Sequence, residues 1–449
     1  MTSLQVRTKP DQRDDGADVL LDWFGPGQKD RRASTVTYKP QFLTGLTPSP
    51  IAWDLFRIAG AVYCADKVVK RSETQNAWTR DLQLQVPVSD PVVWDGVKTR
   101  LDGTLSFLTG DRWDVRFVQD TDLLPVATAT APPNWEAVSL FSGGLDSLAG
   151  VVDRFEAGEK LLLVGHHDSS FTESVQNALS TKLSQHYGGG AFERRSLYLR
   201  PATRGSKTQA RRLPSGVENT TRSRSFLFIA AGVATADALG AEVPLYVPEN
   251  GFIGINVPLT GSRAGSLSTR TTHPLYMSEL QSLLETLGLH HAVKNPYRLQ
   301  TKGELLEGSA NQALVLDLAK DSISCSHPEA RRWIGLPSGN CGWCYPCLIR
   351  RASLNHVGAD NYGFGRAHGA YGLDALTDAT LLDTASGRGQ SLRALTLSLR
   401  RPERVEDVIM NGRVPSGETS DFFEVYARGR EELRNWLKGA GPELKKRLP

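Results

Sequence analysis

The chain has 449 residues, enough for about three domains at roughly 150 residues each. Hydrophobic residues make up 40%, aromatic residues 8% and charged residues 22%, which is typical of a soluble globular protein and excludes long disorder, collagen and a coiled coil. With 52 Lys and Arg against 49 Asp and Glu, the net charge of +3 is too small to make nucleic acid or an anionic membrane the main partner.

The N-terminal residues are polar and charged. No run of about 18 apolar residues occurs in the chain, and residues 1–15 contain no apolar stretch. The sequence therefore predicts neither a membrane-spanning helix nor a secretory signal, and we expect a cytoplasmic protein with no membrane contact. Residues 1–30 are rich in charge and Gly, which predicts an irregular lead-in.

The first part of the chain predicts an N-terminal α+β accessory domain over 1–130. Alternation of apolar and polar residues predicts a strand at 32–38, and apolar residues at helical spacing predict a helix at 51–71. Two further alternating stretches, 82–86 and 113–118, predict strands separated by turns that contain Gly and Asp.

A stretch rich in Pro, Ala and Thr, 125–133, is typical of a linker. Beyond it, short apolar runs alternate with helical segments, which predicts an α/β domain with a doubly wound parallel sheet over 134–357. The expected strands are 137–141, 160–164, 196–199 and 243–247, and the expected helices are 147–155, 172–187 and 225–239. The helical patches of 358–449 predict a helical C-terminal extension.

The sharpest motif is a glycine loop at residues 139–147, SLFSGGLDS. An apolar strand runs into Gly143 and Gly144 and then directly into a helix, whose first N–H groups are unpaired and lie at the positive end of the helix dipole. Glycines let the backbone close around phosphate oxygens, and Ser142 and Ser147 add hydroxyl donors. The loop has neither the Gly-Lys-Ser/Thr of a Walker A motif nor the spacing of a dinucleotide fingerprint. An ordinary strand-to-helix turn is the alternative.

The run Ser-Gly-Gly-Leu-Asp-Ser resembles the PP-loop of the ATP pyrophosphatases. In that family the loop holds the pyrophosphate part of ATP while a substrate oxygen attacks the α-phosphate, which yields an adenylated intermediate and PPi. The resemblance implies an adenine nucleotide alpha hydrolase-like fold and ATP binding by Ser142, Gly143, Gly144, Asp146 and Ser147. Asp146 and Ser147 are its catalytic candidates, and Mg²⁺ is expected near Asp146 because PPi leaves poorly until its charge is neutralised.

Four of the five cysteines gather in the second half of the chain, and Cys64 stands alone. The four are Cys325, Cys341, Cys344 and Cys347. In a reducing compartment such a cluster predicts a metal site. Four thiolates satisfy tetrahedral Zn²⁺ and leave no open position, so the expected site is structural. A [4Fe–4S] cluster and four unconnected thiols are the alternatives, and His327 is a possible substitute for Cys325.

The glycine loop followed by Cys-x2-Cys-x2-Cys-Leu-x-Arg-Arg resembles 7-cyano-7-deazaguanine synthase, the QueC family. That enzyme adenylates the carboxylate of 7-carboxy-7-deazaguanine and uses ammonia to make first the amide and then the nitrile. The resemblance covers residues 137–357, about half of the chain, and implies ATP, Mg²⁺ and Zn²⁺ as cofactors.

Three further positions match this family in order. Arg224 matches an arginine that approaches the nucleotide, although Ser225 stands where the family has Asn. His166 ends a predicted strand at the place where adenine sits, since ligands lie beyond the carboxyl ends of parallel strands. Lys302, in Thr-Lys-Gly-Glu, matches a Thr-Lys-x-Glu and is a catalytic candidate that neutralises phosphate charge. A solvated histidine and a surface lysine are the alternatives for the last two.

The expected substrate pocket departs from the family. Glu249, Asn250, Arg270 and His273 fall where the synthase has this pocket, but the chain reads TRTTHP at 269–274 where the synthase has Asp-Cys-Arg-Pro-Glu-Phe. The departure bears on the free deazaguanine product more than on adenylation. A basic stretch at 194–212 is typical of a mobile solvated loop, with guidance of a nucleotide or macromolecule as the alternative.

Neither the first region nor the tail belongs to a minimal synthase. Long QueC-like proteins with such additions belong to bacterial anti-phage operons, the group that includes QatC, and residues 81–111 resemble its front domain. The resemblance implies a C–N ligase of phage defence that joins a 7-deazaguanine carboxylate to an amine of a partner protein from the same operon. From the small net charge we expect no direct contact to nucleic acid. The alternatives are nitrile synthesis with ammonia for nucleic-acid modification, a catalytically silent nucleotide-binding scaffold, and an RNA-thiolating enzyme.

Overall fold

The computed structural model describes residues 1–9, 11–23, 35–39, 41–120, 134–202, 217–218, 222–260, 269–367 and 369–448. The predicted linker at 125–133 lies outside these residues, as do positions 203–212 of the basic stretch. The beginning of that stretch belongs to strand β8 (Phe192–Pro201), which confirms the strand predicted at 196–199 and shows that this part of the basic stretch is not a solvated loop. Its apolar residues Leu197 and Leu199 are buried, so Arg194 and Arg195 before them and Arg200 after them are carried on a core strand.

The N-terminal region is built on a four-stranded sheet in the order β2–β1–β4–β5. The strands are β1 (Thr2–Arg7), β2 (Val19–Asp22), β4 (Asp81–Val88) and β5 (Arg112–Gln119). All three pairings are parallel, so this region is α/β and differs from the predicted α+β arrangement. The predicted irregular lead-in is also wrong in part, because residues 2–7 form β1 and its apolar side chains Leu4 and Val6 are buried between polar neighbours.

Helix α1 (Pro50–Val68) is buried on nearly every side. Its residues belong to one hydrophobic core with the N-terminal strands, the second sheet and helix α5 (Arg224–Leu239). A helix that is apolar all round lies in the interior of a protein, and α1 packs against β4, β8 and α5. The N-terminal region therefore shares a core with the sheet that follows it in the chain.

The second sheet has six strands in the order β10–β9–β6–β7–β8–β3. Besides β8 these are β6 (Ala137–Leu140), β7 (Leu161–His167), β9 (Leu245–Tyr246), β10 (Val293–Lys294) and β3 (Val36–Lys39). The pairings among β6 to β10 are parallel, which confirms an α/β fold with a parallel sheet. Strand β3 comes before the predicted linker and pairs antiparallel with β8 at the edge of this sheet.

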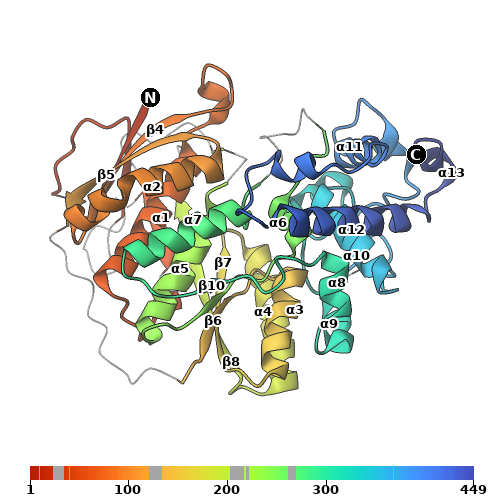
Figure 1. Ribbon diagram of the computed structural model, residues 1–449, viewed down its shortest axis with the longest axis horizontal. Helices are drawn as coiled ribbons and strands as arrows, with labels where there is room; N and C mark the ends of the chain where they lie inside the picture. Colours follow the sequence, from red (N-terminus) through yellow and green to blue (C-terminus); the bar gives the residue numbers. More distant parts are fainter. Residues whose placement is uncertain are drawn as a thin grey trace.

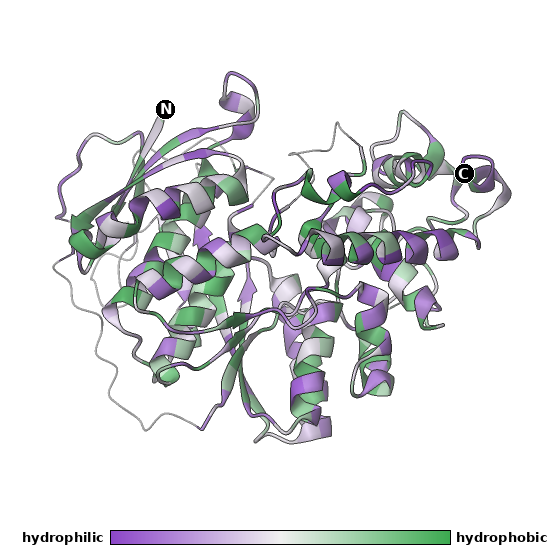
Figure 2. Cartoon of the chain, viewed as in Figure 1, coloured by the Kyte–Doolittle hydropathy of each residue, from purple (hydrophilic) through white to green (hydrophobic). Residues whose placement is uncertain are grey.

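Helices cover both faces of the second sheet (Figure 1). Helices α3 (Leu145–Glu156) and α4 (Ser170–Tyr187) lie on one face, and α5 and α7 (Pro274–Thr286) lie on the other. Strand β7 shows why both faces are needed: Leu161 and Leu163 pack with α3 and α4, whereas Leu162 and Val164 pack with α1 and α5. Figure 2 shows hydrophobic residues along these central strands.

The C-terminal elements form a third core around the cysteines, at the end of the molecule away from the N-terminal sheet (Figure 1). The helices of this core are α6 (Gly251–Ile255), α10 (Tyr345–His356), α11 (Gln390–Leu399), α12 (Thr419–Leu437) and α13 (Pro442–Lys445). Helices α8 (Lys302–Glu307) and α9 (Gln312–Ala319) belong to the core that includes α3 and α4. Helix α2 (Pro91–Thr109) belongs to the N-terminal region and covers its sheet. The short 3₁₀ helices of the chain are η2 (Gln41–Leu43), η3 (Arg71–Glu73), η5 (Pro328–Ile334), η6 (Ala379–Leu382) and η7 (Val405–Ile409).

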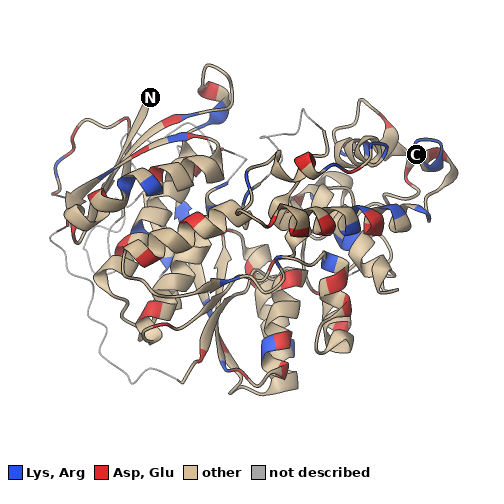
Figure 3. Ribbon diagram, viewed as in Figure 1, with Lys and Arg blue, Asp and Glu red and all other residues tan. Residues whose placement is uncertain are grey.

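Acidic and basic residues both occur along helix α12 (Figure 3). Within the described part of the chain, none of the helices combines the length and the apolar character that crossing a membrane requires.

We predict that Gly251→Ala lowers the free energy of unfolding by about 1–3 kcal/mol, the usual cost of overpacking. The N–H of Gly251 donates to the carbonyl oxygens of Tyr297 and Gln300 at 3.1 and 2.7 Å, and an added Cβ would overlap the carbonyl oxygen of Arg298. Urea unfolding measures the change. Gly254→Ala on the same helix is the control, since its Cβ would lie 3.5 Å from its nearest neighbour, and equal stability of the two variants would contradict the prediction.

Candidate functional site

The predicted PP-loop lies between β6 and α3, at the carboxyl end of an interior strand. Gly143 has a φ of +83°, a left-handed conformation that favours glycine. Ser142 Oγ accepts a hydrogen bond from the N–H of Gly144 at 3.2 Å and lies 3.1 Å from Ser147 Oγ, which also bonds the carbonyl oxygen of Gly144 at 3.0 Å. No described side chain caps α3, so its first N–H groups are available to an anion.

A buried ion pair stands beside this loop. Lys302 Nζ lies 2.6 Å from Asp146 Oδ1, and both side chains are buried. Asn250 donates to the other oxygen, Asp146 Oδ2, from Nδ2 at 2.8 Å and from its backbone N–H at 3.3 Å. The structure thus brings together three predicted site residues that are far apart in sequence, and Lys302 is not the surface lysine that the sequence left open.

Lys302 is fixed in place by its own helix. Thr301 caps α8, and its side chain and that of Glu304 form a capping box. Glu432 of α12 accepts a hydrogen bond from the hydroxyl of Thr301 and another from the N–H of Gly303 at 3.3 Å. The C-terminal extension therefore holds the helix that presents the ammonium group.

Glu249 directly precedes Asn250 in the chain and interacts electrostatically with Asp146 and Lys302. Its Oε2 accepts hydrogen bonds from Thr272 Oγ1 at 2.6 Å and Thr271 Oγ1 at 3.4 Å. Burial raises the pKa of Glu249, and the charge of Asp146 raises it further, against the hydroxyl of Thr272 and the ammonium of Lys302. Thr272, which bonds Glu249, also lines a cavity of about 310 Å³, whose lining further includes Gly251, Asn295, Met277, Glu418 and Phe422.

Arg270 and His273 lie in another environment. The guanidinium of Arg270 donates to the carbonyl oxygens of Asn411 and Phe107 at 2.6 and 2.5 Å and lies 4.5 Å above the Phe107 ring. His273 Nδ1 accepts the N–H of Leu275 at 3.2 Å and so caps α7. Burial lowers the pKa of His273 to about 3. Arg270 and His273 therefore connect α2, α7 and the C-terminal extension. Neither side chain lies beside Asp146 in the structure.

His166 and Arg224 meet beyond the loop. Arg224 donates from Nε to His166 Nδ1 and from Nη2 to the His166 carbonyl oxygen, both at 3.1 Å. Because Nδ1 accepts, the neutral ring carries its proton on Nε2. Burial lowers the pKa of His166, and the charge of Arg224 lowers it further. His166 is fully buried, so in this structure it orients Arg224.

Gln176 is a residue of this site that the sequence did not reveal. Its Nε2 lies 3.3 Å from the carbonyl oxygen of Ser142 and 3.3 Å from that of His166. The side chain is fully buried and bridges the loop to the next strand. Nothing in the helical pattern of 172–187 distinguishes it from a solvent-exposed glutamine.

The four predicted cysteines form one cluster, and their sulfur atoms all lie within 4.8 Å of one another. The Cys325–Cys344 and Cys341–Cys347 sulfur distances are both 3.8 Å. A tetrahedron with Zn–S bonds of about 2.3 Å has edges of about 3.8 Å, whereas a disulfide requires about 2.05 Å. The cluster can therefore hold a single metal ion such as zinc, and His327 is not part of it.

The cluster is connected to the glycine loop. The N–H of Ile323 donates to the carbonyl oxygen of Gly143 at 2.9 Å, two residues before Cys325. Asn340, which precedes Cys341, accepts from the N–H of Ser324 at 3.1 Å. A metal ion here would stabilise the segment on which the loop rests.

Asp146 does not form a second metal site in this structure. Both of its oxygens accept hydrogen bonds from Lys302 or Asn250, and an added cation would compete with an ammonium group. Across the described ranges, the cysteine cluster is the only group of three or more His, Cys, Asp or Glu side chains close enough to share one ion.

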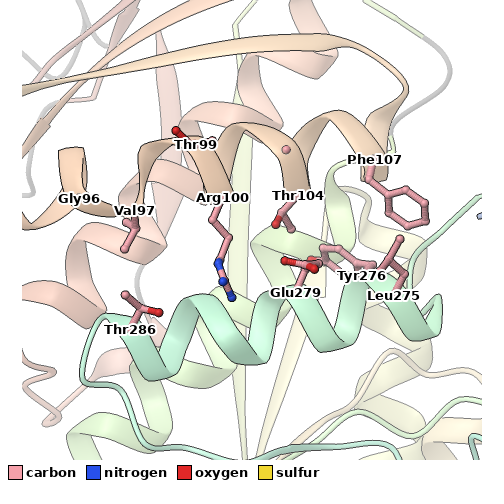
Figure 4. Close-up of a pocket in the computed structure, with 11 residues that line it drawn as sticks. Gly96, Val97, Thr99, Arg100, Thr104, Phe107, Leu275, Tyr276, Glu279 and Thr286 are labelled. Atoms are coloured by element: carbon pink, nitrogen blue, oxygen red, sulfur yellow. The ribbon is translucent and has the colours of Figure 1, made fainter. Parts of the chain in front are cut away.

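A groove of about 540 Å³ lies between α2 and α7 (Figure 4). Thr104, Phe107 and Tyr276 line its floor, and Arg100 and Glu279 project into it from the two helices. None of the residues that the sequence singled out lines this groove within the described part of the chain.

In comparisons with known proteins, no protein-family model matches the chain and no curated protein matches it.

We predict that Cys344→Ser releases the metal ion and lowers the midpoint of thermal unfolding, because a closed thiolate site contributes folding free energy directly. Metal content by mass spectrometry and thermal unfolding check this. Cys64→Ser is the control: Cys64 is buried outside the cluster, and its variant should keep the metal. Full metal content in the Cys344 variant would show that the cluster is not the metal site.

Proposed function

We propose that this protein is an ATP-dependent C–N ligase of the QueC-like type, which adenylates a 7-deazaguanine carboxylate and joins it to an amine of a partner protein in phage defence. The proposal rests on one arrangement: the glycine loop, the uncapped start of α3 and the buried Asp146–Lys302 pair stand together at the carboxyl end of a parallel sheet. Ligands of open α/β sheets bind at this edge.

The loop supplies phosphate recognition. Backbone N–H groups at a helix start bind anions, and the positive φ of Gly143 turns the backbone so that the chain can pass close to a ligand. Lys302 and Arg224 add positive charge on two sides of the loop. Asp146 keeps the Lys302 ammonium in place when no nucleotide is bound.

The reaction requires no nucleophilic side chain. A carboxylate oxygen of the acid attacks the α-phosphorus of ATP, the bond to the bridging oxygen breaks, and PPi leaves. The amine then attacks the acyl carbon, AMP leaves with the bonding electron pair, and the amine loses one proton. The protein contributes position and charge stabilisation in both steps.

Glu249 is our candidate acceptor for that proton. Two threonine hydroxyls hold its Oε2, and its raised pKa makes it a better base than an exposed carboxylate. Its partner Thr272 lines the cavity of about 310 Å³, which is bordered by α6, α7 and the C-terminal extension, and we assign this cavity to the incoming amine.

Mg²⁺ would supply charge neutralisation of the leaving PPi. Since Asp146 is bonded to Lys302 and Asn250, the residues of the loop do not form a ready carboxylate site, and the phosphate oxygens of ATP are the ligands that we propose for the ion.

For the cysteine cluster we propose Zn²⁺, because its sulfur distances leave room for a single ion and not for an iron–sulfur cluster. Reduced thiolates are compatible with a cytoplasmic protein.

The experiment that tests the function incubates the full chain with ATP, Mg²⁺, 7-carboxy-7-deazaguanine and its operon neighbours. Intact mass of the proteins and release of PPi are followed together. A mass increase of one acyl group on a neighbour supports the ligase. PPi release with a free amide or nitrile indicates a small-molecule synthase, and silence in both measurements indicates a scaffold without catalysis.

We predict that Lys302→Met with Asp146→Asn, which removes both charges of the buried pair, lowers the rate of PPi release by about 100-fold or more, as for the loss of a group that stabilises transition-state charge. The double variant avoids leaving one charge buried and unpaired. Lys320→Met with Asp317→Asn removes an exposed ion pair of the same 2.6 Å length and should leave the rate unchanged. Equal rates for both double variants would argue against the site.

We predict that Glu249→Gln stabilises the fold relative to the native chain more at pH 8 than at pH 5. The folded-state pKa of Glu249 is raised, so the folded protein holds this proton more tightly, and stability is lost as the pH rises through the interval above the ordinary value. The glutamine variant lacks this loss. Thermal midpoints across this pH range measure it, and Glu406→Gln at an exposed position should show no such trend.

A further inference from the structure

We infer that helix α1 of the N-terminal region positions the proposed nucleotide site, and that Asp66 does so by fixing the start of α5 and with it Arg224. The inference rests on the proposed function. Asp66 is fully buried, and its Oδ2 accepts three hydrogen bonds: from the N–H of Arg222 at 2.8 Å, from the N–H of Ser223 at 2.9 Å and from the hydroxyl of Ser223 at 2.8 Å. A carboxylate from another helix therefore caps α5.

The capping carboxylate is itself held rigidly. Its other oxygen, Oδ1, lies 2.5 Å from Arg80 Nη2, and Arg80 also bonds both oxygens of Asp111, at 3.1 and 2.6 Å. Arg71 bonds the same two oxygens of Asp111 at 2.8 Å each. Two buried carboxylates thus face two buried guanidinium groups, which compensates their charges and leaves Asp66 little freedom to move.

Arg224 is the first residue of α5, so the cap determines where its side chain starts. Two of its nitrogens bond His166, and Nη1 has no partner in the described part of the chain. The ring of His166 packs edge-on against Tyr63 of α1, with ring centroids 5.5 Å apart. Helix α1 therefore contacts both the element that carries Arg224 and the residue that orients it.

A continuous set of contacts joins this arrangement to the glycine loop. The carbonyl oxygen of His166 also accepts from Gln176, whose Nε2 bonds the carbonyl oxygen of Ser142. Gly165 leaves room for this side chain, since a Cβ there would lie 2.6 Å from Gln176 Oε1. The distance from the guanidinium group to the loop is thus set by buried contacts that end in the N-terminal region.

The test compares two buried aspartates of the same helix. Asp54 of α1 bonds the N–H and the hydroxyl of Ser89 at 2.8 and 2.6 Å and Trp94 Nε1 at 3.1 Å, all within the N-terminal region. Asp66→Asn should raise the Kd for ATP about tenfold, the effect of weakening one charge-assisted contact, and should raise KM more than it lowers kcat for PPi release. Asp54→Asn should leave the Kd unchanged. Binding is measured by calorimetry on the full chain, with metal content and thermal midpoint recorded for each variant.

A double-variant cycle separates positioning from general loosening. In an Arg224→Ala background the effect of Asp66→Asn on the Kd should vanish, because Asp66 acts through Arg224. The inference would be overturned if the Kd changes of Asp66→Asn and Arg224→Ala multiplied in the double variant. Equal Kd values for the Asp66 and Asp54 variants would also overturn it. If Asp66→Asn does not fold, Ser223→Ala removes only one of the three bonds to Oδ2 and should raise the Kd by about two- to threefold; an unchanged Kd would overturn the inference.

The two proposals fail in different ways. If the native chain binds no ATP, both the proposed function and this inference are wrong. If the native chain binds ATP and the Asp66 variant binds it equally well, the function stands and only the role of α1 is wrong.

Discussion

The structure depends on one constraint: α1 is enclosed by protein over most of its length, so the charges that it buries need partners in the interior. A buried charge costs a great deal unless it is paired and hydrogen-bonded. Arg57 pairs with Asp120 beyond β5, and Asp66 pairs with Arg80 and caps α5. Arg80 and Asp120 lie next to strands of the N-terminal sheet, so satisfying these charges fixes that sheet and the start of α5 against α1. The contacts of His166 with Gln176 and Arg224, next to the glycine loop, depend on this arrangement.

The sequence predicts well those features that are local or strongly periodic. The apolar run at 137–141 is close to β6, and the helix predicted at 225–239 differs from α5 by one residue. Buried parallel strands are read as continuous apolar runs, which is why the sheet could be foreseen. Three of the four cysteines lie within one short segment around the start of α10, so their spacing alone brings their sulfur atoms together.

The contacts that complete the site could not be foreseen, because they join buried polar groups across the topology. Lys302 and Asn250 reach Asp146 from separate elements, and Gln176 has the pattern of any helical glutamine. The sequence analysis did not predict helices α2 and α7, and in both cases the reason is local. Gly96 and Gly103 weaken the helical pattern of α2, and Pro274 is typical of a turn although it begins α7. The role of Arg270 and His273 in tying three regions together likewise depends on the fold.

Strand β3 has a consequence for how this chain can be divided. It pairs with residues 198–201 of β8, where the edge of the sheet would otherwise present a row of unpaired N–H and C=O groups. A fragment that starts after residue 133 would lose this cover and would also uncover the side of α5 that packs on α1. Such a fragment keeps the glycine loop and the cysteines and yet offers neighbouring copies an open strand and an apolar surface, so it would self-associate. The half of the chain that carries the motifs is therefore not a unit that would be soluble on its own.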